Sequence, residues 1–468
     1  MPPLHQKKRS PTPEFFWARQ NDGKIDHIEF FNYFIHYSRK NVISRYSNIL
    51  NIYLSDDNRR KLLAQKYKTW KSSKESKIFW QERELKRQQL TQDFRSSSEI
   101  STTADNIANF NISFINSTFT NKSLYVMDTS KAIELIESNI ASSANNQGEY
   151  IINDVDILKQ FNIFQQHILG MLETTSLKYT NHLDHALATA SVLMVRNSLH
   201  TDMEKFFHKN TIRAIMNDRL SNCGMFTHNF AADLLMDVKV IIQDVIAQKI
   251  TSIRAAKLLL ALVKEDTNEE NDLYQNKVIL CFKRMIEEFP RETLCVEETE
   301  LITRFIQSSL QPLFDDIDSE VYLRWTNTQT EEHREDTVSC SDRRPDGCLT
   351  AVIKNKKINL GFSEVKTTKY AKDSHKLNAD LYRLGVFSKN TINANHLAGA
   401  LSIQITGTSI AFFLTEKKRE GLYLMTELDV IKFPTTLKEI PQLLGYVDNL
   451  CDILHVFHTK CWPHPGRF

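Results

Sequence analysis

The residues best suited to chemistry lie in the last third of the chain. Asp346 stands in an RRPDG segment, and 18 positions later the segment GFSEVKTT contains Glu364 and Lys366. In a β-strand, side chains two positions apart point to the same face, so these two should lie side by side while Val365 points into a core. The polar KNKK segment between the motifs predicts a turn that folds the two strands together. Two carboxylates and one ammonium group should then meet.

Such a group of side chains suits the hydrolysis of a phosphodiester. Carboxylate oxygens bind a hard divalent cation such as Mg²⁺ (or Mn²⁺), which keeps several waters. The cation can polarise the phosphodiester, and an adjacent ammonium group can orient the attacking water or offset charge in the transition state. We therefore expect Asp346 and Glu364 to hold metal and Lys366 to serve the water. The alternative is a solvated surface hairpin, in which Asp346 begins a turn and Glu364 pairs with Lys366.

The surrounding elements predict an α/β sandwich. The order αβββαββα places helices before and after a group of strands, which favours a mixed sheet covered on both faces. The helical and β-rich runs are expected at Glu297–Phe314, Val321–Thr326, Gly347–Ile353, Ile358–Thr367, Ser374–Ser388, Ala400–Thr415, Gly421–Phe433 and Thr436–Thr459.

With these motifs and this order, residues 292–460 resemble the PD-(D/E)XK nuclease superfamily, whose signature is Pro-Asp followed across a hairpin by Asp or Glu, any residue and Lys. The resemblance implies a restriction-endonuclease-like domain and metal-dependent cleavage by Asp346, Glu364 and Lys366. In such nucleases an acidic residue on the first core helix often joins the metal site, which points to Glu300, with Glu298 as substitute. A third possibility is that the fold is kept and the site is silent.

The helix expected after the second motif carries a further polar face. Lys376, Asp380 and Arg383 follow one another at i, i+4 and i+7, so they share one side of a helix. They could meet the substrate backbone or structural partners.

The distribution of charge points to a polyanion. The formal net charge is only +2, but residues 1–95 contain 20 Lys or Arg against 10 Asp or Glu. A basic block on a mildly acidic body is typical of proteins that bind nucleic acid. We expect Phe34 or Tyr37 to wedge between base steps, unless the aromatic residues of this block are simply its core. The residues expected to neutralise phosphates are Arg39, Lys40, Arg45, Arg59, Arg60 and Lys61.

The same block resembles the HMG-box, a three-helix module that binds the minor groove of DNA. The resemblance covers about residues 27–95 and is carried by NYFIHYSRK at 32–40, AQKYKTW at 64–70 and the aromatic pair at 79–80. The sequence departs from the pattern at Tyr67, where tryptophan is expected, in a turn one residue longer after Trp70, and in lacking a Pro-rich entry to the first helix. The resemblance implies duplex DNA as the partner, and with the Lys7-Lys8-Arg9 triplet it favours the nucleus.

These observations predict a multidomain α+β protein. Its parts are an N-terminal three-helix module at 27–95, a Ser/Asn/Thr-rich linker at 96–150 with one short helix near 130–140, a helical region at 151–290 and a restriction-endonuclease-like domain at 291–460. The clearest amphipathic helices of the third part are expected at Asp233–Gln248 and Ile253–Val263. The expected function is DNA binding with metal-dependent cleavage. The alternative is a non-enzymatic chromatin or transcription factor whose nuclease-like fold only binds.

Several other classes of protein are disfavoured. Seven cysteines without a CxxC pair indicate neither a disulfide framework nor a Cys-rich zinc site, and no apolar run is long enough for a membrane span. There is no Gly-rich phosphate loop, GxSxG or HExxH motif. Two sets have spacings that could suit zinc but are more typical of helix and tail: His182 with His185, and His455, His458, Cys461 and His464.

Overall fold

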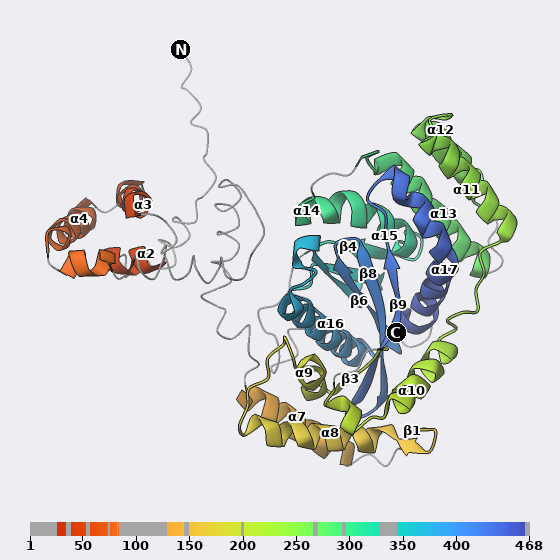
Figure 1. Ribbon diagram of the computed structural model, residues 1–468, viewed down its shortest axis with the longest axis horizontal. Helices are drawn as coiled ribbons and strands as arrows, with labels where there is room; N and C mark the ends of the chain where they lie inside the picture. The colour runs from red at the N-terminus through yellow and green to blue at the C-terminus, as the bar shows by residue number, and fades with distance from the viewer. Residues whose placement is uncertain are drawn as a thin grey trace. The chain divides into compact units, whose positions relative to one another are not determined.

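The computed structural model divides into two compact units, residues 1–120 and 121–468 (Figure 1). The residues that the structure describes are 26–33, 39–52, 57–73, 75–81, 83, 129–144, 149–197, 201–264, 270–292, 296–326 and 344–463.

The N-terminal unit is helical in all of its described segments. Its helices are α2 (His27–Tyr33), α3 (Arg39–Ile52) and α4 (Asp57–Lys71), followed by helical residues 75–81. Phe31 is fully buried and Trp80 nearly so, and the rings of Trp70 and Phe79 pack against this aromatic core. These aromatic residues therefore belong to the core of the basic block, which was the alternative to a role between DNA bases.

The second unit is a mixed α+β fold around one sheet. Seven described strands lie in the order β3-β9-β8-β7-β6-β5-β4, with both parallel and antiparallel neighbours. Their bounds are β3 (Val192–Val195), β4 (Val321–Arg324), β5 (Gly347–Ile353), β6 (Lys356–Lys366), β7 (Gly399–Thr406), β8 (Ser409–Arg419) and β9 (Leu422–Lys432), and a separate small hairpin is made by β1 (Ile151–Ile152) and β2 (Val155–Asp156).

Helices cover both faces of the sheet (Figure 1). On one face, Phe362 of β6 contacts Phe387 of α16, and on the other, Phe412 of β8 contacts Phe314 of α15. The helices before the sheet core are α7 (Thr129–Ala144), α8 (Ile157–Leu172), α9 (Leu183–Thr189), η1 (Met203–Lys205), α10 (Lys209–Asn222), α11 (Ala232–Ile246), α12 (Ser252–Leu260) and α13 (Glu270–Glu288). Those within and after it are α14 (Glu298–Glu300), η2 (Leu301–Ile306), α15 (Gln307–Phe314), η4 (Thr368–Tyr370), α16 (Ser374–Asn395), η5 (Leu437–Tyr446), α17 (Val447–Val456) and η6 (Phe457–Cys461).

The hairpin predicted between the two motifs is confirmed. β5 and β6 pair antiparallel, and the turn between them is formed by Lys354 and Asn355, both with positive φ angles of 48° and 65°. Two such residues make the tight turn that matches the twist of the flanking strands. The crossover helix α16 then returns the chain so that β7 runs parallel to β6.

Two parts of the predicted order are wrong. The run expected as one strand at 400–415 is the hairpin of β7 and β8, which turns at Gly407 with a φ of +60°. The region expected to be helical throughout, 151–290, contributes strand β3, which pairs with β9 at one end of the sheet. All four β3 residues are buried, so the strand lacks the alternation that marks a half-exposed strand.

The middle region and the C-terminal region share one hydrophobic core. Val192 of β3, Phe282 of α13 and Phe362 of β6 belong to the same buried cluster. The sequence boundary at 290 therefore does not separate two cores. Of the described helices, none combines the length and apolar character needed to cross a membrane.

Candidate active site

The two predicted motifs meet at one end of the β5–β6 hairpin. Gly347 pairs with Ser363, so Asp346 lies just beyond the ladder, beside Glu364. The Asp346 Oδ2 atom accepts a hydrogen bond of 2.8 Å from the backbone N–H of Val365. The Pro-Asp segment is thus held against the second motif by its own side chain.

Strand alternation sends the second motif to the two faces of the sheet, as predicted. Val365 is fully buried on one face. Glu364 and Lys366 lie on the other face, which α16 covers, and the Lys366 Nζ atom is 3.7 Å from Asp346 Oδ2 and 4.0 Å from Glu364 Oε2. The three predicted catalytic side chains therefore converge at a single site.

Helix α16 adds two charged residues to this site. Asp380 Oδ2 lies 3.2 Å from the Lys366 Nζ atom, and an Arg383 Nη2 atom donates to Glu364 Oε2 at 2.7 Å. Arg383 also donates to Asp380 one turn earlier. The sequence pattern placed both residues on one helix face, and the structure directs that face at the two motifs. The third member of the pattern, Lys376, instead lies 3.7 Å from the centre of the Tyr370 ring.

Lys366 is held as a cation. Burial by itself would lower the pKa of this amine, but the carboxylates of Asp380, Asp346 and Glu364 together raise the pKa above its ordinary value. The Nζ atom also donates to the Val365 carbonyl at 2.8 Å. Lys366 can therefore donate hydrogen bonds and offset negative charge at neutral pH, but it is not suited to act as a general base.

Glu364 is the most deeply buried member of the site, with 1% of its side chain exposed. Burial raises the pKa of this carboxyl well above its ordinary value, Arg383 lowers it, Asp346 and Asp380 raise it further and Lys366 lowers it. Its Oε1 atom is buried and makes no hydrogen bond with any described residue. When Glu364 is ionised, this oxygen could accept a positive partner.

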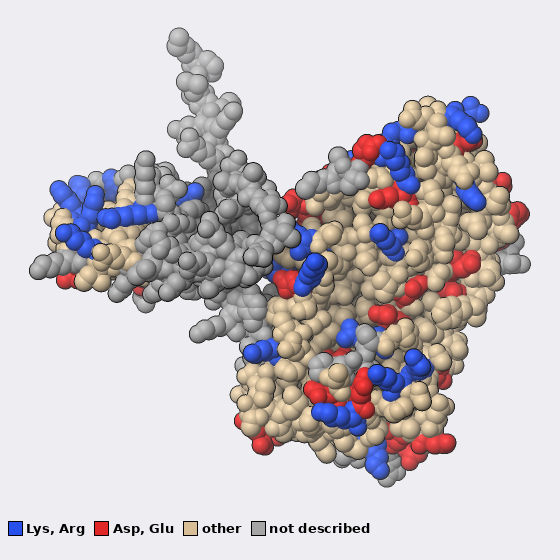
Figure 2. All heavy atoms as spheres, viewed as in Figure 1, with Lys and Arg blue, Asp and Glu red and all other residues tan. Residues whose placement is uncertain are grey.

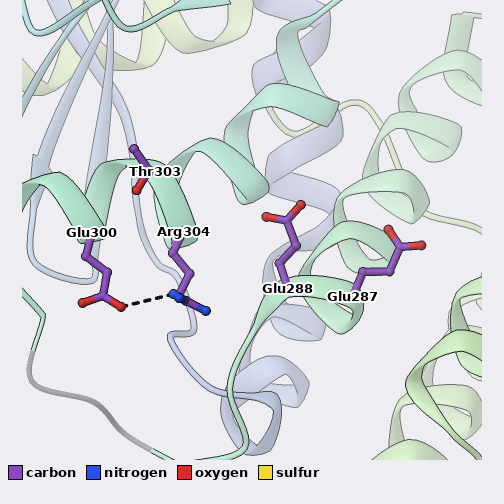
Figure 3. Close-up of a pocket in the computed structure, with 5 residues that line it drawn as sticks. All are labelled: Glu287, Glu288, Glu300, Thr303 and Arg304. Atoms are coloured by element: carbon purple, nitrogen blue, oxygen red, sulfur yellow. Dashed lines mark hydrogen bonds and ion pairs between the residues drawn. The ribbon is translucent and has the colours of Figure 1, made fainter. Parts of the chain in front are cut away.

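The acidic residue expected from the first core helix is Glu298 rather than Glu300. Burial raises the pKa of Glu298, Lys366 lowers it, and Asp346 and Asp380 raise it, which places this carboxyl within electrostatic reach of the site. Glu300 instead pairs with Arg304 at 3.2 Å and lines a separate surface pocket (Figure 3). The other residues that line this pocket are Arg304, Glu287, Glu288 and Thr303. The assignment of Glu300 to the site is corrected accordingly.

The donor set fits a divalent cation held by few protein ligands. When all four are ionised, the carboxylates of Asp346, Glu364, Asp380 and Glu298 outnumber the cations Lys366 and Arg383 by two, and a divalent ion would balance that charge. The described residues contain no group of three or more His, Cys, Asp or Glu arranged to hold a metal. Mg²⁺ is commonly bound through one or two carboxylates together with water and substrate. The second oxygen of Asp346 and the Glu364 Oε1 atom are the atoms that could serve.

The site reaches the surface. The side chains of Asp346 and Lys366 are 21% and 16% exposed, whereas Asp380 is almost fully buried. Exposed lysines Lys369 and Lys372 lie on the segment that joins β6 to α16. A phosphate group could therefore approach from the side of Asp346 and Lys366.

The residues predicted to bind DNA are distributed unevenly over the N-terminal unit. Lys61 is exposed on α4, and Arg39 is exposed with its guanidinium carbon 4.9 Å from the centre of a Trp80 ring. Arg45 and Arg60 are partly buried, and burial lowers the pKa of Arg45. Figure 2 shows Lys and Arg side chains gathered over α3 and α4. The side chains of Lys40 and Arg59, and all of Phe34 and Tyr37, lie outside the described residues.

The histidines with zinc-like spacing have other neighbours. His182 Nδ1 accepts from the backbone N–H of Lys178. The ring of His455 on α17 lies 4.3 Å from that of His228, and His458 of η6 stacks on Trp462 with ring centres 5.0 Å apart. Cys461 is fully buried, and His464 lies outside the described residues.

Arg383 is the site residue whose role the sequence left open. Its spacing from Asp380 was visible, but its partner Glu364 lies 19 residues earlier on a strand, and no local pattern joins them. One sequence signal could have identified Arg383. A glutamate on a buried face of a strand is unfavourable without a cation beside it, so Glu364 requires a buried cationic partner.

The chain was also compared with known proteins. Neither a family model nor a curated protein nor a solved structure matches it.

Proposed function

We propose that this protein binds duplex DNA and hydrolyses its phosphodiester bonds with the help of Mg²⁺ or Mn²⁺. The single observation that carries the proposal is the meeting of Asp346, Glu364 and Lys366 at one partly exposed point, from two motifs on a hairpin. Buried carboxylates in excess of their cationic partners are unfavourable in a solvated surface hairpin. The same arrangement, with an ammonium group beside it, is well suited to bind a cation and a phosphate.

The roles follow from the contacts. Asp346 and Glu364 would hold the cation through their remaining oxygens, and a bound Mg²⁺ or Mn²⁺ supplies Lewis-acid polarisation of the phosphodiester. Lys366, as a permanent cation, donates a hydrogen bond to the attacking water or to a phosphate oxygen and offsets the charge that develops there. Asp380 holds the Lys366 ammonium at 3.2 Å, and Glu298 lies within electrostatic reach of Lys366.

The basic N-terminal unit would supply affinity for the duplex. Its exposed lysines and arginines can neutralise backbone phosphates, which gives binding that weakens as salt rises. The resemblance to HMG-box modules and the Lys7-Lys8-Arg9 triplet are the grounds for proposing duplex DNA and the nucleus.

A second function is favoured by one specific contact. Arg383 lies 2.7 Å from one oxygen of Glu364. In a catalytically silent site, such an arginine would replace the metal as the permanent counter-ion of the glutamate. On this alternative the protein is a non-enzymatic chromatin or transcription factor, and its C-terminal fold only binds.

The experiment is a cleavage assay with the purified full-length protein on supercoiled and linear duplex DNA. We expect nicking or cleavage with Mg²⁺ or Mn²⁺, none with EDTA, and at least a hundredfold loss in Asp346→Ala and Lys366→Met variants that remain folded. The matched control is Lys356→Met, which removes an exposed lysine at the opposite end of β6. Binding without cleavage on all substrates, or cleavage that persists in both site variants, would refute the nuclease assignment.

A further inference from the structure

Helices α11 and α12 present apolar side chains to the outside. Among the described residues, five of the twelve large hydrophobic side chains that are exposed belong to these two helices. Met236 and Val240 on α11 are 55% and 50% exposed, and Ile253 and Leu260 on α12 are 72% and 50% exposed. In both helices the spacing, four or seven residues, puts the pair on one side. Each helix thus has a buried stripe that packs on the protein and a second apolar stripe on its outer side.

Charged residues of opposite sign flank the two outer stripes. On α11 they are Asp233 and Asp237, and on α12 they are Arg254 and Lys257, and all four are exposed; α11 also carries one exposed lysine, Lys239. In the described part of the chain, none of these four side chains forms an ion pair, whereas the neighbouring Asp244 pairs with Lys249 at 2.9 Å. Figure 2 shows Lys or Arg atoms and Asp or Glu atoms beside uncharged ones on the surface over α11 and α12.

We infer that this surface, defined by Met236, Val240, Ile253 and Leu260 and referred to below as the α11–α12 face, binds a second copy of the same chain. In a two-fold dimer, α11 of one copy would lie against α12 of the other, and the same contact would occur twice. The acidic flank of each α11 would then meet the basic flank of the partner's α12, while the apolar stripes pack between them. Because each chain carries both complementary halves, a second copy can satisfy both of them at once.

Other occupants fit this face less well. Nucleic acid would be repelled by Asp233 and Asp237 and offers no apolar surface to Ile253. An anionic membrane surface would also be repelled by the acidic flank. Paired charges of both signs around an apolar centre are typical of protein interfaces, in which rim charges set register and exclude wrong partners.

The inference is independent of the proposed function and is tested on the full-length chain by sedimentation equilibrium. We expect reversible dimerisation of the wild-type protein. Asp233→Lys with Asp237→Lys, and separately Arg254→Glu with Lys257→Glu, should each weaken self-association by at least about tenfold, because like charges then face each other across both contacts. The matched control is Glu134→Lys with Glu137→Lys, which makes the same change of charge on two exposed residues of α7 and should leave the dimer unchanged.

The decisive measurement is the self-association of a mixture of the two charge-reversed proteins. In a mixed dimer the reversed α11 of one chain meets the reversed α12 of the other, and both unlike-charge contacts are restored. We expect the mixture to associate to within about threefold of the wild-type affinity although neither protein does so alone. Three outcomes would overturn the inference: a monomeric wild-type protein, a dimer affinity that neither charge reversal changes, or a mixture that fails to associate.

Discussion

The carboxylate of Asp346 accepts a hydrogen bond from the backbone N–H of Val365, 19 residues further along the chain. Because Val365 itself is buried on the opposite face of β6, this bond links Asp346 to the strand backbone rather than to a mobile side chain. Glu364 and Lys366, the residues on either side of Val365, are thereby held beside Asp346. The contact ties Asp346, the residue that directly precedes β5, to the backbone of β6.

The first prediction separates the two glutamates of the first core helix. If the proposed cleavage takes place, Glu298→Gln should reduce its rate by about tenfold or more, because Glu298 adds charge within reach of Lys366, Asp346 and Asp380. Glu300→Gln should leave the rate unchanged, since Glu300 pairs with Arg304 away from the site. Single-turnover cleavage rates at saturating Mg²⁺ measure both. Equal losses in the two variants would contradict the placement of Glu298.

The second prediction concerns the pairing of Arg383 with Glu364. Arg383→Met leaves a fully buried carboxylate without its closest cation, and removing one partner of a buried pair costs about 3–5 kcal/mol. The double variant Arg383→Met, Glu364→Gln removes both charges and should recover most of that loss. Urea unfolding of the three proteins at pH 7, followed by circular dichroism, gives the free energies of unfolding.

The pairing also has a pH signature. Glu364 has a pKa raised above 4.5 in the folded protein, so the folded state binds the proton more tightly than the unfolded state. Its contribution to stability is full below pH 4.5 and is lost as the pH rises through the folded pKa. Arg383→Met should therefore be less harmful at pH 5 than at pH 8. A loss that does not depend on pH would argue against an ionised Glu364 as its cause.

A third prediction uses His458 as an acid-sensitive group. Burial lowers the pKa of His458 to about 4, with Lys277 adding to the effect. The unfolded chain therefore takes up the proton first, and the wild-type protein should lose up to about 3 kcal/mol from this residue as the pH falls from 6.5 to 4. His458→Phe keeps the aromatic stack on Trp462 and should show a smaller loss of stability over that range. Parallel pH dependences of the two proteins would rule out this assignment.

The fourth prediction addresses the N-terminal unit. Because Lys61 is exposed on α4, its removal should weaken duplex binding without unfolding the unit. Lys61→Ala should lower the slope of log affinity against log salt concentration by about 0.9 if its ammonium contacts one phosphate. Fluorescence anisotropy with labelled duplexes at several salt concentrations measures the slope. The control Lys432→Ala, on β9, should leave the slope unchanged.

The local parts of the site could be predicted from the sequence. Strand alternation was sufficient to put Glu364 and Lys366 on one face with Val365 on the other, and a polar turn between two β-rich runs was sufficient to bring Asp346 to them. These relationships depend on covalent geometry and on residues fewer than 20 positions apart. The helices α11 and α12 were predicted for the same reason, since their apolar periodicity is local.

Only the tertiary structure decided which helix faces complete the site. Glu298 and Glu300 stand about 200° apart around a helix, so the choice between them depends on how that helix packs on the sheet. Strand β3 pairs with β9 more than 200 residues later, and its four buried residues carry no alternating pattern that would reveal a strand. The pairing of Arg383 with Glu364 likewise depends on where α16 lies across β6. Sequence patterns record periodicity along the chain, whereas these contacts are fixed by the burial of apolar surface between distant elements.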